Sequence, residues 1–253
     1  MTQKNSSWDS VSEWYDEYLE VSEDSFQKKV ILPNILRIID IKKGDKVLDL
    51  ACGQGFFSRE FYNAGAEVSG VDISPKLIEI AKTKSPKDVR FEVASADKLS
   101  FIKDGSFDRA VIILALQNIE NLNGVIGECS RVLKKGGRFI FVLNHPVFRL
   151  PKKSSWGWDD ENKIQYRRLD SYLSEYSSQI EMHPGERSKE HTISFHRSLQ
   201  VYLKALIKNG FCLTNFEEWI SHKKSEPGPR AKSEDTARKE FPMFLCIGAT
   251  KLL

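Results

Sequence analysis

Three aspartates and two glycines stand out near the ends of short apolar runs in the first hundred residues. Gly53 and Gly55 lie in a loop that directly follows one such run. Glycine allows the tight turns and positive φ angles that bring a ligand close to the main chain. Asp49, Asp72 and Asp97 lie at or just beyond the ends of three successive runs. Because parallel strands end at one edge of an α/β sheet, this placement predicts one shared site for a small ligand.

Asp72 and Asp97 have the chemistry needed to bind a nucleoside. Asp72 ends the second apolar run, where a carboxylate accepts hydrogen bonds from both ribose hydroxyls. Asp97 follows the third run, where its carboxylate can accept a hydrogen bond from the exocyclic amine of adenine. The backbone N–H groups of Ala96 and Asp97 would then face the ring nitrogens. The alternative for Asp97 is a structural role as a helix cap or turn residue.

Asp49 separates two classes of nucleoside cofactor. A pyrophosphate held by the glycine loop would meet this carboxylate at short range, and the repulsion would cost on the order of several kcal/mol. S-adenosylmethionine instead brings a cationic ammonium and a sulfonium to the same place. Ser58 also stands where a dinucleotide fingerprint would have its third glycine. Both features favour S-adenosylmethionine over NAD, and the structural alternative for Asp49 is capping of the following turn.

The elements around these residues alternate between strand and helix. Such alternation predicts an α/β fold with a parallel sheet covered by helices on both faces. Ser74 is the expected cap of one of these helices, with Pro75 at its first position. The expected strands are 46–50, 68–71, 89–93, 107–114, 138–143, 211–219 and 244–251, and helices are expected over 25–41, 56–63, 122–133, 196–209 and after Ser74.

The alternation stops after residue 144. The following stretch is polar and aromatic, and we expect an insertion over the carboxyl edge of the sheet that includes an antiparallel hairpin. Its aromatic side chains could line a substrate pocket or form the core of a cap. The charged, Pro- and Gly-containing stretch 221–242 is expected to be a mobile linker. The predicted organisation is a lid segment (1–24), a cofactor-binding core (25–145), a substrate cap (146–195) and completion of the core sheet (196–253).

Composition limits the remaining possibilities. The chain has 253 residues, 40% of them hydrophobic, with a net charge of +3. This near balance of charge does not require a nucleic-acid partner. The four cysteines are scattered without metal-ligand spacing, and we see neither a secretion signal nor an apolar run long enough to span a membrane. We therefore expect a cytoplasmic protein without a metal or a membrane partner, and the sequence does not indicate its oligomeric state.

Several motifs resemble those of the class I S-adenosylmethionine-dependent methyltransferases. Val47-Leu48-Asp49-Leu50-Ala51-Cys52-Gly53-Gln54-Gly55 resembles their motif I, and Gly70-Val71-Asp72-Ile73-Ser74 resembles their ribose motif. Ala96-Asp97, Phe107-Asp108 and Leu133-Lys134-Lys135-Gly136-Gly137 fall where later motifs belong. The resemblance covers residues 25–145. Ala51 replaces a glycine that many members carry, and its small size predicts little effect.

The resemblance implies a Rossmann-like, seven-stranded, mostly parallel sheet whose last strand is antiparallel. It also implies that Leu114 and Gln117 face the cofactor, and that Tyr15 and Tyr18 belong to an N-terminal lid, although they could equally pack an N-terminal helix. The expected cofactor-binding residues are Tyr15, Asp49, Ala51, Gly53, Gly55, Asp72, Ile73, Ala96, Asp97, Leu114 and Gln117.

His145 is the candidate catalytic base, because it follows the fifth strand and an imidazole titrates near neutral pH. The alternative is a histidine that orients the loop or contacts substrate without moving a proton. His196, followed by Arg197, stands at the start of a helix, where capping or anion binding is an equal alternative. The candidate substrate-binding residues are Tyr18, His145, Trp156, Tyr172 and His196.

The segment after the fourth strand, Leu114-Ala115-Leu116-Gln117, lacks the Asn/Asp-Pro-Pro-aromatic signature expected of enzymes that methylate base amines. The sequence therefore favours transfer of a methyl group to an oxygen or nitrogen of a small molecule. Three alternatives remain: methylation of RNA or protein, a non-catalytic cofactor-binding member, and an NAD(P)-dependent oxidoreductase.

Overall fold

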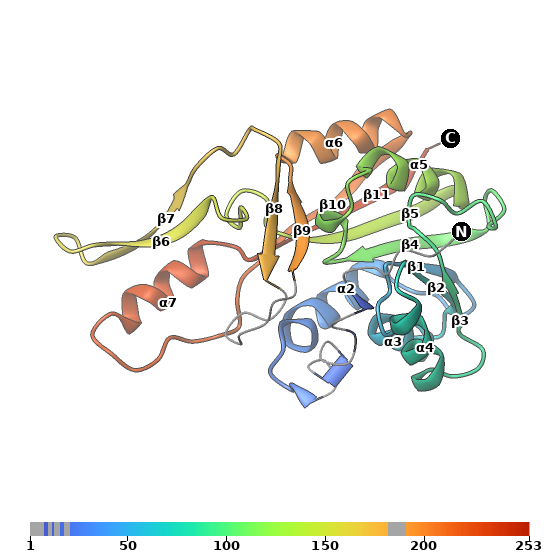
Figure 1. Ribbon diagram of the computed structural model, residues 1–253, viewed down its shortest axis with the longest axis horizontal. Helices are drawn as coiled ribbons and strands as arrows, with labels where there is room; N and C mark the ends of the chain where they lie inside the picture. The colour runs from blue at the N-terminus through green and yellow to red at the C-terminus, as the bar shows by residue number, and fades with distance from the viewer. Residues whose placement is uncertain (1–7, 10–11, 13–15, 18–20, 182–190, 253) are drawn as a thin grey trace.

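A seven-stranded sheet forms the centre of the protein. The computed structural model describes residues 8–9, 12, 16–17, 21–181 and 191–252. The strand order is β10-β11-β5-β4-β1-β2-β3, and only β11 runs antiparallel to its neighbours (Figure 1). This arrangement confirms the Rossmann-like sheet with an antiparallel last strand. The strands are β1 (Lys46–Leu50), β2 (Glu67–Asp72), β3 (Arg90–Val93), β4 (Phe107–Ile113), β5 (Leu133–Asn144), β10 (Phe211–Trp219) and β11 (Phe244–Lys251).

Helices cover both faces of this sheet (Figure 1). The central strands are buried on both sides, and along β5 successive side chains alternate between two apolar clusters. Phe139 and Phe141 belong to the cluster under α5 and α6, whereas Ile140 and Val142 belong to the cluster under α2, α3 and α4. The helical elements are η2 (Gln27–Ile31), α2 (Leu32–Ile39), α3 (Phe56–Asn63), α4 (Pro75–Lys84), η3 (Leu116–Asn118), α5 (Leu122–Val132), α6 (Leu199–Lys208) and α7 (Ala231–Glu240).

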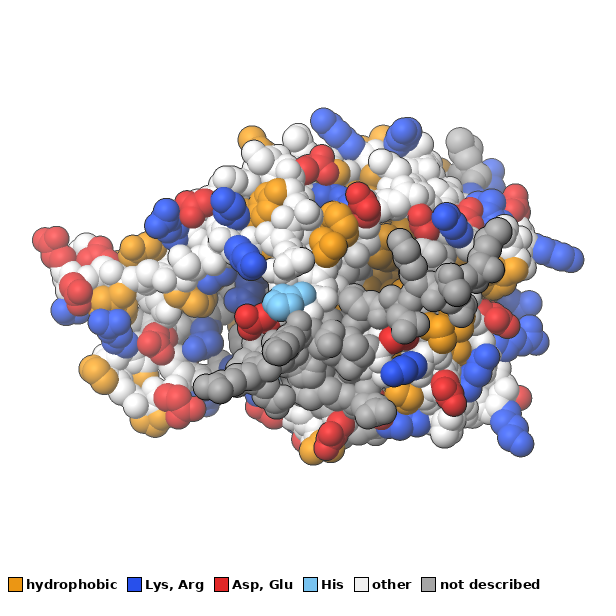
Figure 2. Space-filling view, viewed as in Figure 1, with side chains coloured by type: hydrophobic (Ala, Val, Ile, Leu, Met, Phe, Trp, Pro, Cys, Tyr) orange, Lys and Arg blue, Asp and Glu red, His pale blue; other side chains and the backbone are white. Residues whose placement is uncertain are grey.

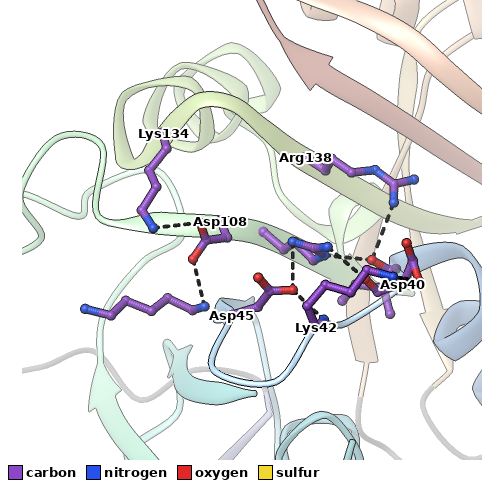
Figure 3. A network of polar contacts seen from close by, with 9 residues as sticks. Asp40, Lys42, Asp45, Asp108, Lys134 and Arg138 are labelled. Carbon is purple, nitrogen blue, oxygen red and sulfur yellow. Dashed lines mark hydrogen bonds and ion pairs between the residues drawn. The ribbon is translucent and has the colours of Figure 1, made fainter. Parts of the chain in front are cut away.

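Ion pairs brace the amino ends of the central strands, opposite the carboxyl edge (Figure 3). Lys134 donates to Asp108 at 2.6 Å, and the other oxygen of Asp108 accepts the backbone N–H of Lys46 at 2.9 Å. Arg109 pairs with Asp45 at 3.1 Å. These contacts join β1, β4 and β5 at one end. Asp108, which belongs to one of the recognised motifs, therefore has a structural role.

The stretch after β5 contains two hairpins rather than one. They pair β6 (Ser154–Asp159) with β7 (Ile164–Leu169), and β8 (Tyr176–Glu181) with β9 (His191–His196). The expectation of an antiparallel hairpin in this insertion is confirmed, with a second hairpin added.

The prediction of a mobile linker over 221–242 is wrong for its second half, which forms α7. This helix lies against β7, and the ring of Phe241 just after it packs edge-on at 5.4 Å from Trp156. Only Ala237 of α7 is buried, so the helix lacks an apolar stripe that would have revealed it in the sequence.

Basic and acidic side chains are interspersed over the face drawn in Figure 2, in keeping with the small net charge. Within the described ranges, no helix is both long and apolar enough to cross a membrane.

Candidate active site

A cavity of about 510 Å³ opens at the carboxyl edge of β1, β2 and β4. It is lined by residues that follow each of these strands, among them Ala51 and Gly53 after β1, Ile73 after β2 and Leu114 after β4. Asp72, Ala96 and Asp97 line it as well. Most of the residues expected to bind a nucleoside are therefore brought to one cavity by the topology of the sheet.

The loop after β1 is held in a conformation that favours glycine. Gly53 has a φ of 57° and Gly55 a φ of 81°, and Ala51 adopts 53°. Gly53 lines the cavity, whereas Gly55 lies on the other side of the turn. A Cβ atom added at Gly55 would lie 3.0 Å from the Phe91 ring, so this glycine allows the loop to pack against β3.

Asp72 is fixed by the loops on both sides of it. One carboxylate oxygen accepts the N–H of Gly53 at 2.9 Å, and the other accepts the N–H of Ser74 at 2.8 Å. Burial raises the pKa of Asp72, and these backbone hydrogen bonds partly oppose the rise. The hydroxyl of Ser74 donates to Asp9 at 2.5 Å, and the neighbouring Trp8 lines the cavity. The described residues of the N-terminal segment are thus connected to the end of the cavity that Asp72 lines.

Asp49 lies beneath the loop and does not line the cavity. Its side chain is 2% exposed and accepts a hydrogen bond from the Ser58 hydroxyl at 2.6 Å. Desolvation raises the pKa of Asp49 to about 7, and the charge of Asp72 adds to the rise while Ser58 opposes it. Ser58, which stands where a dinucleotide fingerprint would have its third glycine, is therefore the hydrogen-bond partner of Asp49.

Asp97 is oriented by its neighbours at the other end of the cavity. It accepts hydrogen bonds from Ser95 at 2.5 Å and from the amide of Asn121 at 2.8 Å. Desolvation would raise the pKa of Asp97, but these hydrogen bonds outweigh it and the pKa is lowered. Asn121, rather than Asp97, caps α5 by accepting the N–H of Gly124.

A second cavity of about 300 Å³ lies beyond the carboxyl ends of β4 and β5. Phe195 of β9 lines both cavities. Gln117, which was expected to face the cofactor, lines this second cavity instead. Its Nε2 donates to the carbonyl of Leu114 at 2.7 Å, and its buried Oε1 has no hydrogen-bond partner among the described residues.

The candidate base His145 lines neither cavity and is 1% exposed. Its Nδ1 accepts the N–H of Val147 at 3.2 Å, so Nε2 carries the proton and donates to Glu218 at 2.8 Å. Desolvation lowers the pKa of His145, although Glu218 opposes this. Both ring nitrogens of His145 already have hydrogen-bond partners, and this favours the loop-orienting alternative over the catalytic base.

Of the other substrate candidates that the structure describes, His196 lines the second cavity, whereas Trp156 and Tyr172 do not. Nε2 of the His196 ring donates to the carbonyl oxygen of Tyr172 at 2.7 Å. The hydroxyl of Tyr172 accepts the N–H of Leu199 at the start of α6. Trp156 is in contact with Arg167, whose guanidinium lies 5.0 Å from the ring centroid. Tyr15 and Tyr18 lie outside the described residues.

Several lining residues were not expected from the sequence: Trp8, Asn121, Thr192, Phe195, Arg149 and Arg167. Trp8 had a signal, because it is one of the aromatics in the polar N-terminal segment. The others had none, because they come from elements of the insertion or from loops that only the tertiary fold brings to the site. Among the described residues, no cluster of three or more His, Cys, Asp or Glu side chains could hold a metal ion.

The chain is similar to known methyltransferases over its first half. Residues 48–141 match a family model described as a methyltransferase domain. The chain is 33% identical over 113 residues to a demethylmenaquinone methyltransferase of Tropheryma whipplei, covering 44% of this chain and 46% of that protein. It is also 33% identical over 105 residues to a ubiquinone biosynthesis O-methyltransferase of Xanthomonas oryzae pv. oryzae, covering 40% and 44%. It spans about half the length of these curated relatives.

One solved structure resembles the chain over nearly its whole length. It is the crystal structure of an S-adenosylmethionine dependent methyltransferase from Mesorhizobium loti, with a TM-score of 0.69 and 28% sequence identity. The match covers 90% of this chain and 98% of that one. Residues 48–141 thus match a methyltransferase domain, and the sheet and motifs around them are like those of the class I S-adenosylmethionine-dependent methyltransferases.

Proposed function

We propose that this protein binds S-adenosylmethionine in the first cavity and transfers its methyl group to an oxygen or nitrogen of a small molecule bound in the second. The observation that carries the proposal is the pair of adjoining cavities at the carboxyl edge, with Phe195 in the wall of each. When bound, S-adenosylmethionine supplies an activated methyl group, so the protein mainly has to orient the acceptor and exclude water. The relatives named for methylation of quinone precursors support a small-molecule acceptor.

The residues of the first cavity fit the parts of the cofactor. The Asp72 carboxylate is positioned to accept the ribose hydroxyls, and Asp97 with the Ala96 backbone to recognise adenine. Asp49 is buried two residues before the loop, where its charged form is stabilised by a bound cation and opposed by a phosphate. The residues present therefore fit S-adenosylmethionine better than a dinucleotide.

Thermal unfolding tests cofactor binding. A ligand that binds only the folded state raises the melting temperature, so S-adenosylmethionine and S-adenosylhomocysteine should each give a shift that NAD and NADP do not. Asp72→Asn should abolish most of that shift, while Asp160→Asn in the β6–β7 turn should preserve it. A shift given by NAD(P) alone would overturn the proposal in favour of an oxidoreductase. Binding without turnover on any small-molecule acceptor would indicate a non-catalytic member.

A further inference from the structure

Three arginines from separate parts of the chain line the second cavity. Arg149 follows β5, Arg167 lies on β7 and Arg197 directly follows β9. A guanidinium carries its charge at any physiological pH and offers five N–H donors to an oxyanion. The elements differ in sequence position but converge on one space of about 300 Å³.

Carboxylates of the described residues balance only part of the positive charge in this cavity, because Arg197 alone of the three arginines has an ion pair. Arg149 makes no side-chain hydrogen bond or ion pair with any described residue. The nearest acid to Arg197 is Glu175, at 3.9 Å, and its side chain is 59% exposed. Desolvation lowers the pKa of Arg167, and the like charge of Arg149 lowers it further. Both side chains are half-buried in the wall of one cavity, where like charges destabilise each other and a bound anion would relieve this.

Two of the arginines are held in position with donors left over. The guanidinium of Arg167 donates to the Phe148 carbonyl at 2.8 Å and to Ser154 at 2.7 Å. Arg197 is 5% exposed, and its Nη2 donates to the carbonyls of residues 119 and 120. Its Nη1 is buried without a hydrogen-bond partner in the described part of the chain. A buried N–H group without a partner is costly, and the oxygen of a ligand is the simplest partner for it.

We propose that the second cavity selects a methyl acceptor bearing an oxyanion, a carboxylate or a phosphate, which Arg149, Arg167 and Arg197 bind. This inference rests on the proposed function. The unpartnered Oε1 of Gln117 can only accept a hydrogen bond, so it fits an O–H or N–H group of the same acceptor. Gln117 holds the carbonyl of Leu114, which lines the cofactor cavity. The acceptor is thus oriented with its nucleophile toward the cofactor and its anionic group toward the arginines.

Anion binding to the full chain, saturated with S-adenosylhomocysteine, tests this inference. The probes are benzoate and inorganic phosphate, with benzamide as the uncharged match for benzoate, and the readouts are calorimetry and quenching of tryptophan fluorescence, because Trp156 lies against Arg167. We expect benzoate or phosphate to bind and benzamide to bind at least about tenfold more weakly, since charge-assisted hydrogen bonds are lost. Tighter binding of benzoate indicates a carboxylate acceptor, and tighter binding of phosphate a phosphorylated one.

Arg149→Gln should weaken the preferred probe at least about tenfold, because it removes the arginine that supports no other described side chain. Arg168→Gln is the matched control, since Arg168 neighbours Arg167 on β7 but is exposed and pairs with Asp170. Equal binding of charged and uncharged probes, or an unchanged affinity in both Arg149→Gln and Arg167→Gln, would overturn the inference. If S-adenosylhomocysteine binds but neither anion does, the inference fails and the proposed function stands; if S-adenosylhomocysteine does not bind, the proposed function itself fails.

Discussion

Asp49 is an acid kept partly protonated at neutral pH by its position beneath the glycine loop. Its raised pKa, about 7, comes from burial, and the one hydrogen bond from Ser58 does not offset the loss of water. A cation bound above the loop would favour the charged form and lower this pKa. Cofactor binding and deprotonation of Asp49 are therefore linked.

We predict that S-adenosylmethionine binds more tightly as the pH rises through about 7 and that protons are released on binding. Calorimetry in buffers of different ionisation enthalpy measures this release, and Asp49→Asn should eliminate it. In the free protein the folded state keeps the proton of Asp49 up to about pH 7, while the unfolded chain releases it at about pH 4. The free energy of unfolding should therefore decrease as the pH rises from about 4 to about 7, and this decrease should be smaller in Asp49→Asn. Proton release that is identical in the variant would contradict the assignment.

The two histidines near the carboxyl ends of the strands differ in what their rings can do. In His196, Nε2 donates to a carbonyl oxygen, which accepts only, so Nδ1 of the neutral ring keeps its lone pair. In His145, both nitrogens are already engaged. His196 is thus the better candidate for a proton-accepting role.

We predict that His196→Gln lowers kcat by at least about 100-fold, the lower end of the effect of removing a general base. His145→Gln should lower the melting temperature instead, because it breaks the contact with Glu218, and should leave kcat nearly unchanged. Steady-state rates together with thermal unfolding distinguish the two variants. If His196→Gln keeps the full rate, His196 is not the general base.

At the scale of elements, the β1–α3 loop depends on backbone conformations that a side chain resists. Gly55 has a positive φ and almost touches Phe91, whereas Gly44 has a similar φ of 84° but open space around its Cα. Substituting each glycine in turn therefore separates the free-energy cost of the left-handed backbone conformation from the cost of crowding against Phe91.

We predict that Gly44→Ala lowers the free energy of unfolding by about 1–2 kcal/mol, because a left-handed conformation is unfavourable for alanine. Gly55→Ala should lower it by about a further 1–3 kcal/mol, since the added methyl also displaces the Phe91 ring. Urea unfolding monitored by circular dichroism measures both. If the two substitutions cost the same, the loop can move away from β3 and its position is not fixed by this contact.

The elements that sequence patterns predicted best are those whose burial repeats along the chain. The strands from β1 to β5 and the helices between them are apolar at regular spacing, and Ser74 caps α4 as expected by accepting the N–H of Leu77. The prediction failed for α7, which is polar around nearly its whole surface and whose neighbours come from β7. An element without its own apolar pattern cannot be recognised from local sequence.

At the scale of the molecule, the two ends of the sheet have different roles. The amino end is joined by the ion pairs around Asp108 and Arg109 (Figure 3), and the carboxyl end is left open to hold ligands. Desolvation would raise the pKa of Asp108, but the hydrogen bonds from Lys134 and from the Lys46 backbone lower it overall. This acid therefore stays charged and continues to join three strands.

The convergence of Asp72 and Asp97 on one cavity could be predicted, because each lies at or just beyond the end of its own strand and the order of the strands brings these ends together. The arginines of the second cavity could not be predicted, because Arg149 precedes the β6–β7 hairpin, Arg167 lies within it, and the local sequence does not encode the direction of this hairpin. Arg197 gave a partial signal, as a cation at the start of a helix.

Phe195 lines both cavities, and this position has a thermodynamic consequence. A ligand that fixes the ring from one side prepares the surface that the other ligand contacts, so the two binding equilibria are coupled. Such coupling is reciprocal: the factor by which the acceptor tightens the cofactor equals the factor by which the cofactor tightens the acceptor. A single aromatic side chain can in this way make the binding of the two ligands cooperative without any movement of the sheet.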